Sequence, residues 1–283
     1  MIKINGKKID IKKFSNNETN MDDFAADMYL NNTVSVRFDS DADLIHLMFV
    51  KKHIDDKYPT GINKLEIKYF PYSRMDRTEG SKVFTLKYVA AFINSLKFDS
   101  VSIYEAHSNV TTALLDRVDN IDYSVAIAKT CIQEIDFDIN KDFIVFPDEG
   151  ARKRYKNYFK GFKIATCEKV RDFDTQEIIS MALHVTGKFI PADSKCIIVD
   201  DLCSYGRTFV MAAKALKDCN AKEIYLCITH AEQGIFKGDI FRNSYIDKVY
   251  TTNSILDTEK VVYDKDDGES VYDVDKINIE KIF

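Results

Sequence analysis

The chain has 283 residues, 45% of them hydrophobic, which is enough to bury one large core or two moderate ones. Its net charge of -5 argues against general nucleic-acid binding, because that function needs a dense basic surface. No stretch approaches the roughly 18 uninterrupted apolar residues of a membrane span, and residues 1–5 lack the apolar run of a secretory signal. We therefore expect a cytoplasmic protein.

Six cysteines are scattered along the chain without a Cys-x-x-Cys pair. Several lie in apolar runs, as Cys196 does in the run 196–199. We therefore expect buried, reduced thiols, and neither a zinc site nor a disulfide framework.

Short apolar runs recur along the chain, separated by segments of helix length. Runs without strict alternation are typical of strands buried on both faces of a parallel sheet. Between the first two runs, apolar residues at spacings of three and four predict an amphipathic helix: Leu86, Val89, Ile93 and Leu96. The pattern predicts an α/β fold, with strands at 64–70, 100–104, 142–146, 196–199, 223–228 and 248–250.

Polar or charged residues follow directly after these runs. In open parallel sheets, ligands bind at the carboxyl ends of the strands, so these residues predict clefts that hold ligands. The alternative is that polar residues end strands anywhere, but so many charged and metal-binding groups at the strand ends favour a site. The groups are Ser73-Arg74, Glu105-Ala106-His107, Asp148-Glu149-Gly150, Asp200-Asp201, Thr229-His230 and Thr251-Thr252-Asn253-Ser254.

A boundary near residues 136–141 would divide the chain into halves of similar length. Each half then begins a β–α–β series, which indicates two copies of one architecture. We predict two domains, residues 1–138 and residues 139–283.

The strongest motif lies at residues 197–208. An apolar strand delivers two adjacent carboxylates, and a short turn with Ser, Gly and Thr leads into a helix predicted at 209–217. The N–H groups of such a turn and helix form an anion site, and the carboxylates can take ribose hydroxyls or magnesium. The alternative is a plain strand–turn–helix with an acidic cap. The motif resembles the ribose-phosphate site of the phosphoribosyltransferase fold, which assigns that ligand to Asp200, Asp201, Ser204, Tyr205, Gly206, Arg207 and Thr208.

Two segments of the first half resemble the phosphoribosyl-pyrophosphate synthetase family. Residues 69–77, Tyr-Phe-Pro-Tyr-Ser-Arg-Met-Asp-Arg, are similar to a family segment whose first Arg binds ATP. Residues 13–18 are similar to the family's Arg-Phe-Ser-Asp-Gly-Glu, which reaches the ATP site of a neighbouring subunit. Taken alone, the Phe of that segment would be interpreted as an ordinary core aromatic. The resemblance assigns ATP binding to Phe14, Asn16, Glu18, Arg74 and Asp76.

Two more segments match the family around its metal. Glu105-Ala106-His107-Ser108 matches a segment whose acid and His hold magnesium and the ATP phosphates. Residues 147–154 resemble the turn at the ribose site. The resemblance therefore gives Glu105, His107 and Asp148 to the metal, His107 also to ATP, and Asp148 also to the ribose phosphate.

Residues 167–172 resemble the mobile catalytic loop of the family, with its Lys-x-Arg pair. The resemblance makes Lys169 and Arg171 the catalytic residues. Two side chains two apart on an extended segment point the same way, so together they can neutralise charge on a transferring phosphoryl group. The alternative is a solvated charge cluster. We expect residues 168–176 to be mobile without ligands.

The resemblance covers nearly the whole chain, from residue 11 to the end. It implies an α/β protein with two tandem phosphoribosyltransferase-like domains, whose parallel sheets are flanked by helices. Domain 1–138 would bind ATP and domain 139–283 the ribose phosphate. The implied enzyme transfers the β,γ-diphosphate of ATP to the C1 hydroxyl of ribose 5-phosphate, giving phosphoribosyl pyrophosphate and AMP, with Mg2+ as cofactor. A homo-oligomer with shared active sites is also implied.

The phosphate loop departs from the family pattern. Ser204 stands where the family has Asp, and Tyr205-Gly206-Arg207 fills the middle, so we expect a bulkier and more positive loop. Similar small chains from phage NAD-restoring pathways add the diphosphate to ADP-ribose. The altered loop keeps ADP-ribose open as an alternative acceptor.

Two rival functions need different residues. A base-specific phosphoribosyltransferase shares the Asp-Asp loop but has no need of the segments around Phe14 and Arg74. A non-catalytic regulatory partner of a synthetase keeps the fold but usually loses the catalytic loop, whereas Lys169 and Arg171 are present here. The residues therefore favour the synthetase over both rivals.

Overall fold

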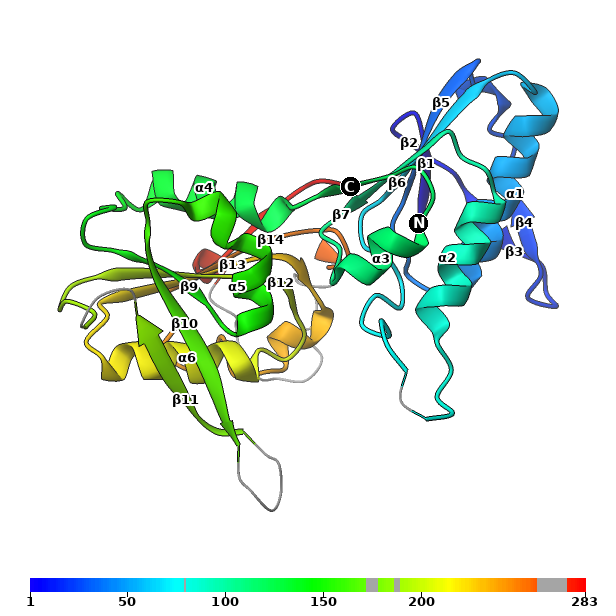
Figure 1. The fold of residues 1–283 in the computed structure, drawn as a ribbon. Helices are drawn as coiled ribbons and strands as arrows, with labels where there is room; N and C mark the ends of the chain where they lie inside the picture. Colours follow the sequence, from blue (N-terminus) through cyan, green and yellow to red (C-terminus); the bar gives the residue numbers. More distant parts are fainter. Residues whose placement is uncertain (79, 172–177, 186–188, 259–273) are drawn as a thin grey trace. The chain divides into compact units, whose positions relative to one another are not determined.

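The computed structural model describes residues 1–78, 80–171, 178–185, 189–258 and 274–283 (Figure 1). The chain forms two compact units: the N-terminal unit, Met1–Asp122 with Phe283, and the C-terminal unit, Tyr123–Ile282. The units divide before the boundary expected near 136–141, because helix α4 (Tyr123–Glu134) packs into the C-terminal core. The assignment of ATP and ribose phosphate to separate domains, 1–138 and 139–283, stays a prediction.

The N-terminal unit is built on a mixed sheet with the strand order β2-β1-β5-β6-β7-β8. Strands β5 to β8 are parallel, and β1 is antiparallel to both of its neighbours. The strands are β1 (Ile2–Ile4), β2 (Lys7–Lys8), β5 (Asn31–Val36), β6 (Ile62–Ile67), β7 (Ser100–Tyr104) and β8 (Val118–Ile121). The helices are α1 (Ala42–Lys57), α2 (Thr85–Ser95), α3 (Asn109–Leu114) and a 3-10 turn at Ala25–Asp27.

Helices α1 and α2 cover one face of this sheet. Val34, Leu65 and Ile103 are buried there together with Leu47 of α1 and Ile93 of α2. Alternate side chains along a strand point to opposite faces. Those on the other face are polar and partly exposed, as at Ser35, Glu66, Ser102 and Tyr104. The N-terminal sheet is therefore amphipathic.

A two-stranded antiparallel arm, β3 (Ile11–Lys13) and β4 (Thr19–Met21), belongs to the same unit. Its loop is closed by main-chain bonds: the N–H of Phe14 donates to the Glu18 carbonyl, and the N–H of Asn17 to the Phe14 carbonyl, both at 2.9 Å. Asn17 takes the left-handed conformation with φ +67°, which Asn tolerates better than most residues. A tight backbone turn thus presents the side chains of residues 14–18 outward.

The C-terminal unit holds a larger sheet with the strand order β11-β10-β9-β12-β13-β14-β15, in which only β11 runs antiparallel. Its strands are β9 (Phe143–Phe146), β10 (Lys163–Arg171), β11 (Ile178–Val185), β12 (Lys195–Cys203), β13 (Glu223–Ala231), β14 (Lys248–Thr252) and β15 (Ile277–Glu280). Its remaining helices are α5 (Glu149–Tyr155), α6 (Arg207–Asp218) and 3-10 turns at Lys156–Phe159, Gln233–Phe236 and Val274–Lys276.

Helices cover both faces of the C-terminal sheet (Figure 1). Helices α4 and α5 pack on the face that carries Ile144 and Val199, while α6 packs on the face that carries Val145 and Ile198. Strands β9 and β12 therefore bury both of their alternating sets, which explains their continuous apolar sequence.

The α/β fold is confirmed, and each predicted strand overlaps an observed one, but the predicted strand 64–70 runs three residues past the end of β6. Residues 100–104 form β7, and the runs 196–199, 223–228 and 248–250 are the centres of longer strands. The predicted burial on both faces holds for the C-terminal sheet but is wrong for β6 and β7, whose outer residues are polar and partly exposed. The two predicted helices coincide with α2 and α6 within two residues at each end.

Several elements were not predicted because their apolar signal is weak or of the wrong kind. Strand β5 reads Asn-Asn-Thr-Val-Ser-Val, and β10 carries Thr166, Glu168 and Lys169. Helix α1 has a block of consecutive apolar residues at 47–50 that hides the helical period. Alternation and interruption of this kind produce no continuous apolar run.

All six cysteines are free thiols, and all but Cys219 are buried. Burial raises the pKa of Cys167 and of Cys196 to about 12, so both stay protonated at neutral pH. The expected buried thiols are therefore confirmed for five of the six. Within the described ranges, no helix is long and apolar enough to cross a membrane.

Candidate active site

The acidic pair lies at the carboxyl end of β12, in the middle of the C-terminal sheet. Asp201 is buried, and its carboxylate forms an ion pair with Arg154 of α5 at 3.1 Å. Asp200 accepts a hydrogen bond from the Asp201 backbone N–H at 3.0 Å. Burial, the Asp201 charge and the more distant charge of Asp148 raise the pKa of Asp200 well above its usual range, although Arg154 opposes them. A buried carboxylate with a raised pKa is typical of acid–base sites.

Lys169, a predicted catalytic residue, contacts an acid that follows the neighbouring strand β9. Lys169 of β10 forms an ion pair with Asp148 at 3.1 Å. Asp148 also caps α5 by accepting the Ala151 N–H at 3.0 Å. Burial opposes ionisation of Asp148, but these two partners outweigh it and hold its pKa below the usual value. The structure therefore brings Asp148 and Lys169 together at the sheet edge that carries the acidic pair.

Arg171, the second predicted catalytic residue, ends β10. The pairing register with β11 shifts between Val170 and Arg171, so the strict alternation behind the Lys-x-Arg prediction is not kept there. Residues 172–176 of the segment expected to be mobile lie outside the described residues. The described part, at residues 168–171, belongs to the β10–β11 pair rather than to a helix.

The predicted phosphate loop, residues 204–208, comprises the turn after β12 (204–206) and the first two residues of α6. Gly206 precedes the helix with φ +81°, a conformation that favours glycine. The first turn of a helix leaves backbone N–H groups without intrahelical partners, which favours anions there. Tyr205 and Arg207 are exposed, whereas Ser204 and Thr208 are partly buried. The loop thus has the geometry of an anion site with two large side chains at its rim.

One acidic residue beside this loop was missed by the sequence prediction. Glu232, just after β13, accepts the Ser204 hydroxyl with 2.5 Å between Oγ and Oε2. The loop was expected to be more positive because Ser204 replaces an acid, but Glu232 restores a carboxylate next to it. No local motif joins two residues 28 positions apart. The only sequence signal was the polar end of β13 at Thr229-His230.

Buried hydroxyls fix the strand ends beneath the acidic pair. Ser124 of α4 donates to the Asp200 carbonyl at 2.6 Å and accepts the Thr229 N–H at 3.1 Å. Thr252 of β14 donates to the Thr229 carbonyl at 2.7 Å, and Ser254 contacts Nδ1 of the buried His230 at 2.7 Å. Because buried polar groups are costly unless they are paired, this network locks the ends of β12, β13 and β14 together.

The N-terminal unit presents a second set of predicted residues at the ends of its strands. Glu105 follows β7 and is buried, with φ +56°, and its N–H donates to the Ile121 carbonyl at 2.8 Å. A positive φ in a buried Glu is uncommon and marks a locally constrained backbone. His107, two residues after Glu105, is partly buried. In the segment after β6, Arg74 is exposed and Asp76 is partly exposed.

The arm carries the remaining predicted ATP residues. Phe14 is 54% exposed, so it is not a core aromatic. Glu18 is exposed, and Asn16 accepts the Glu18 N–H at 3.1 Å. The Asn16 side chain therefore already shapes the loop. An exposed Phe on a tight turn is suited to stacking on a planar partner.

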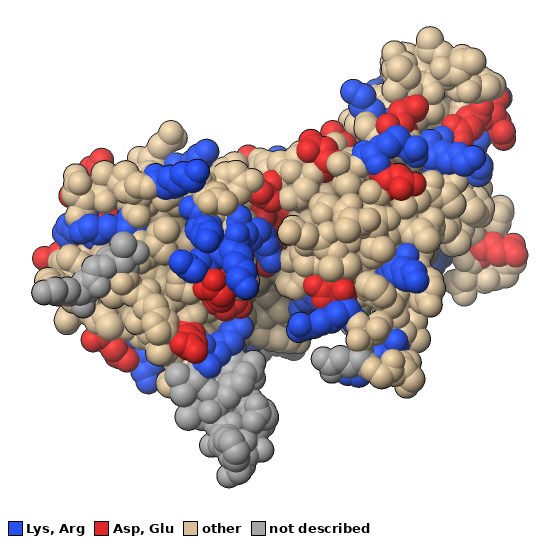
Figure 2. Space-filling model, viewed as in Figure 1, with Lys and Arg blue, Asp and Glu red and all other residues tan. Residues whose placement is uncertain are grey.

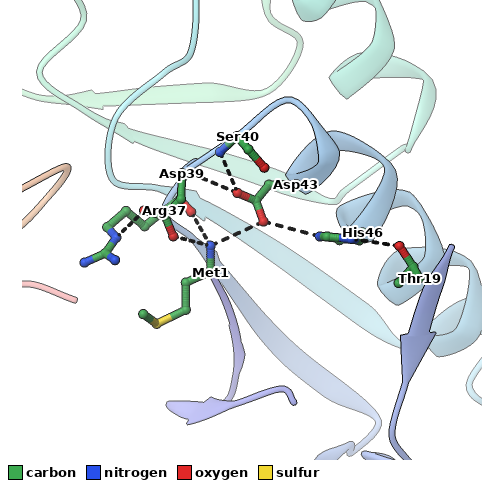
Figure 3. Close-up of polar contacts among 7 residues, drawn as sticks. All are labelled: Met1, Thr19, Arg37, Asp39, Ser40, Asp43 and His46. Carbon is green, nitrogen blue, oxygen red and sulfur yellow. Dashed lines mark hydrogen bonds and ion pairs between the residues drawn. The ribbon is translucent and has the colours of Figure 1, made fainter. Parts of the chain in front are cut away.

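A polar chain anchors this arm to helix α1 (Figure 3). His46 is buried between two elements: its Nε2 lies 3.0 Å from the Thr19 hydroxyl of β4, and its Nδ1 lies 3.4 Å from Asp43. Asp43 also accepts the N–H groups of Asp39 and Ser40. Burial opposes ionisation of Asp43, but these bonds and the amino terminus lower its pKa. The arm is thus tied to a fixed acid on α1.

Charged side chains are mixed over the surface that Figure 2 shows. Lys and Arg side chains gather over α5, with Asp and Glu side chains directly beside them. Helix α5 contributes Arg152, Lys153 and Arg154. Such a local cluster is suited to a small phosphate ligand.

Three residues were predicted to hold magnesium: Glu105, His107 and Asp148. Among the described residues, no three His, Cys, Asp or Glu side chains lie close enough together to hold a metal by themselves. The predicted ligands Glu105 and His107 belong to the N-terminal unit and Asp148 to the C-terminal unit. Magnesium usually takes one or two carboxylates together with substrate phosphates and water. One or two of these residues would therefore suffice for a magnesium ion that also binds substrate phosphates.

The phosphoribosyl transferase domain family matches residues 115–262, just over half of the chain. The chain belongs to that family. The phosphoribosyl transferase match contains the acidic pair and the phosphate loop. A solved structure, phosphoribosylpyrophosphate synthetase from Mycobacterium smegmatis, shares the fold with a TM-score of 0.70, covering 97% of this chain and 86% of that chain at 16% identity. The predicted fold with phosphoribosyltransferase-like domains is thereby confirmed.

Two curated relatives of the chain carry the same name. The ribose-phosphate pyrophosphokinase of Thermosipho africanus is 33% identical over 195 residues, which cover 67% of this chain and 59% of the relative. That of Buchnera aphidicola subsp. Schizaphis graminum is 32% identical over 204 residues, 69% of this chain and 61% of the relative. The chain spans about three-fifths of the length of these relatives. They confirm the resemblance drawn from the motifs.

Proposed function

We propose that the chain is a pyrophosphokinase that transfers the β,γ-diphosphate of ATP to the C1 hydroxyl of ribose 5-phosphate. The observation that carries the proposal is the strand-end arrangement of the C-terminal unit. An acidic pair, a phosphate loop and a lysine paired with Asp148 lie on neighbouring strands. The curated relatives bear the name of this reaction.

In this reaction the C1 oxygen attacks the β-phosphorus of ATP and the bond to the α-phosphate oxygen breaks, so AMP leaves. Such transfers depend on alignment and charge neutralisation more than on covalent catalysis. Residues 204–208 would hold the 5-phosphate, and Asp201, held by Arg154, would orient the ribose hydroxyls. Lys169 would leave its ion pair with Asp148 and bind the transferring phosphoryl group instead. Arg171, two residues further along the chain, would neutralise charge on the same group.

The proton of the C1 hydroxyl needs an acceptor. The raised pKa of Asp200 gives this carboxylate a stronger hold on a proton than an ordinary Asp has. The carboxylate of Asp201 is already paired with Arg154. We therefore assign the proton to Asp200. Bound Mg2+ would supply further neutralisation of the ATP phosphates, with Glu105, His107 or Asp148 as its protein donors.

The ATP side would come from the N-terminal unit. Arg74 and His107 would contact the phosphates, with Asp76 supporting the turn of Arg74, and Phe14 would stack on the adenine. The exposed arm supports the implied homo-oligomer, in which one copy completes the ATP site of another. Mixing inactive Phe14→Ala and Lys169→Ala chains should then restore part of the activity, and no recovery in mixed oligomers would point to a self-contained site.

The free thiols fit a reducing compartment such as the cytoplasm.

The test is AMP release from ATP and Mg2+ by the purified chain, with and without ribose 5-phosphate. We expect AMP only when the sugar phosphate is present, and loss of that signal in Lys169→Ala. Lys163→Ala is the matched control, because Lys163 lies on the same strand but contacts the Phe143 ring instead. AMP release that ignores the sugar would contradict the proposal.

A second acceptor, ADP-ribose, is favoured by the rim of the phosphate loop. Tyr205 is 60% exposed and Arg207 is exposed, so both are available to a second phosphate and a base. Arg207→Gly should impair ADP-ribose turnover about tenfold more than ribose 5-phosphate turnover, the value of one charge-assisted hydrogen bond. Equal effects on both sugars would remove ADP-ribose as the acceptor.

A further inference from the structure

Residues 232–240 are fitted closely against the phosphate loop. A Cβ on Gly238 would lie 1.8 Å from the Tyr205 carbonyl oxygen, and a Cβ on Gly206 would lie 2.3 Å from Cδ1 of Ile240. Only glycine can stand at these two positions without a shift of the backbone or of Ile240. The segment therefore forms the support on which the loop rests.

Glu232 forms one hydrogen bond with the last residue of β12, Cys203, and one with the first residue of the loop, Ser204. Its backbone N–H donates to the Cys203 carbonyl at 2.8 Å, and its carboxylate accepts the Ser204 hydroxyl at 2.5 Å. An O–H···O⁻ distance of this size is typical of a charge-assisted hydrogen bond. Because the Ser204 hydrogen points at Glu232, the same hydroxyl has no hydrogen left to donate to a phosphate.

We propose that Glu232 is a positioning residue of the acceptor site. It holds Ser204, and through Ser204 the turn around Gly206, so that the backbone N–H groups at the start of α6 are fixed before the acceptor phosphate arrives. Preorganised donors cost no reordering on binding. The inference rests on the proposed function only in that the loop binds the acceptor phosphate.

Charge alone predicts the opposite role for Glu232. A carboxylate beside an anion site repels phosphate, so its removal would strengthen binding. Glu232 is partly exposed, and solvent screens its charge. The bond to Ser204 is direct and charge-assisted, and bonds of this kind are worth about ten- to hundredfold in an equilibrium. Positioning therefore outweighs repulsion.

Two variants of Glu232 separate the roles. Glu232→Ala removes the bond and the charge, whereas Glu232→Gln removes the charge but keeps an oxygen that can accept the Ser204 hydroxyl. We expect Glu232→Ala to weaken binding of ribose 5-phosphate and of inorganic phosphate about tenfold or more, with the KM for ATP unchanged. Glu232→Gln should lose less than about threefold.

Ser204→Ala should weaken phosphate binding at least as much as Glu232→Ala, because it breaks the same bond and keeps the Glu232 charge, and the double variant should be no worse than Ser204→Ala. Asp239→Asn is the matched control: Asp239 is an exposed acid of the same segment, so phosphate binding should stay as in the wild type. Binding by Glu232→Ala that equals or exceeds the wild type would overturn the proposal.

A loop readout without ligand keeps this role separate from the proposed function. The chain contains no Trp, so Tyr205→Trp places a single reporter on the loop. In this background we expect Glu232→Ala to lower the fluorescence anisotropy of the free protein, because the loop loses its fastening. Unchanged anisotropy sinks the positioning role by itself. A wild type that binds no phosphorylated sugar sinks the proposed function instead.

Discussion

The two sheets of this chain are covered differently. The C-terminal sheet buries both faces, with α4 and α5 on one side and α6 on the other. The N-terminal sheet buries one face under α1 and α2 and leaves the other partly exposed. Their candidate sites differ in a similar way, since ion pairs and buried hydroxyls surround Asp200 and Asp201, whereas Phe14 and Glu18 project from an exposed arm.

We infer from this difference that the C-terminal site stabilises the transition state and that the arm of the N-terminal unit binds substrate. A sheet held from both sides can fix charged groups at its strand ends, which transition-state stabilisation requires. An arm held by a few polar bonds can grip a substrate but positions its groups less tightly. We therefore expect changes in the C-terminal site to lower kcat and changes at the arm to raise the KM for ATP.

The largest effect should come from Lys169. Lys169→Ala removes a cation that matters mainly in the transition state, so kcat should fall about hundred- to thousandfold while ATP binding stays within about twofold. Steady-state kinetics with both substrates varied measures the two constants. Normal turnover would remove Lys169 from the mechanism.

Asp200→Asn should lower kcat about hundredfold, because the amide cannot take the proton. It should also raise the stability of the protein at neutral pH. The folded-state pKa of Asp200 is raised, so its contribution to stability is full below the usual value of 3.8 and is lost as pH rises through the raised pKa. Asn does not ionise and avoids that loss. Thermal unfolding from pH 3 to pH 8 checks the sign, and a variant less stable than the wild type at neutral pH contradicts it.

A matched pair of substitutions tests the difference between the sheets directly. Val199→Ser in β12 puts an unpaired hydroxyl into a buried face and should cost about 2–4 kcal/mol in the free energy of unfolding. Ser102→Val in β7 lies on the partly exposed face and should change it by less than about 0.5 kcal/mol. Urea denaturation measures both. A large cost for Ser102→Val would mean that this face is buried in solution.

The smallest effect should come from the anchor of the arm. His46→Ala removes the contact with Thr19, a hydrogen bond worth about two- to tenfold in an equilibrium. We expect the KM for ATP to rise by that factor and the KM for the sugar phosphate to stay constant. Lys52→Ala, an exposed change on the same helix, is the control. Equal rises in the KM for ATP and the KM for the sugar phosphate would indicate that the substitution disturbs the whole fold instead of the arm.

Local patterns in the sequence predicted the fold where burial follows the strand period. Residues 100–104 were placed correctly, and the acids at 200–201 were found because they end an apolar run. Strand β5 was not predicted because only two of its six residues, Val34 and Val36, are apolar. The sequence analysis assigned Lys169 and Asp148 to the same active site but did not predict the ion pair between them. The contact of Glu232 with Ser204 depends on tertiary packing between two strand ends, which no short motif records.

The central claim is transfer of an intact diphosphate to a sugar hydroxyl. Phosphorus-31 NMR of ATP, Mg2+ and ribose 5-phosphate with the purified chain tests it most directly, because it identifies every phosphorus-containing product. We predict AMP and a C1-linked diphosphate ester of the sugar phosphate in equal amounts, without ADP. Formation of ADP, or of free pyrophosphate with AMP and an unchanged sugar, would contradict the account.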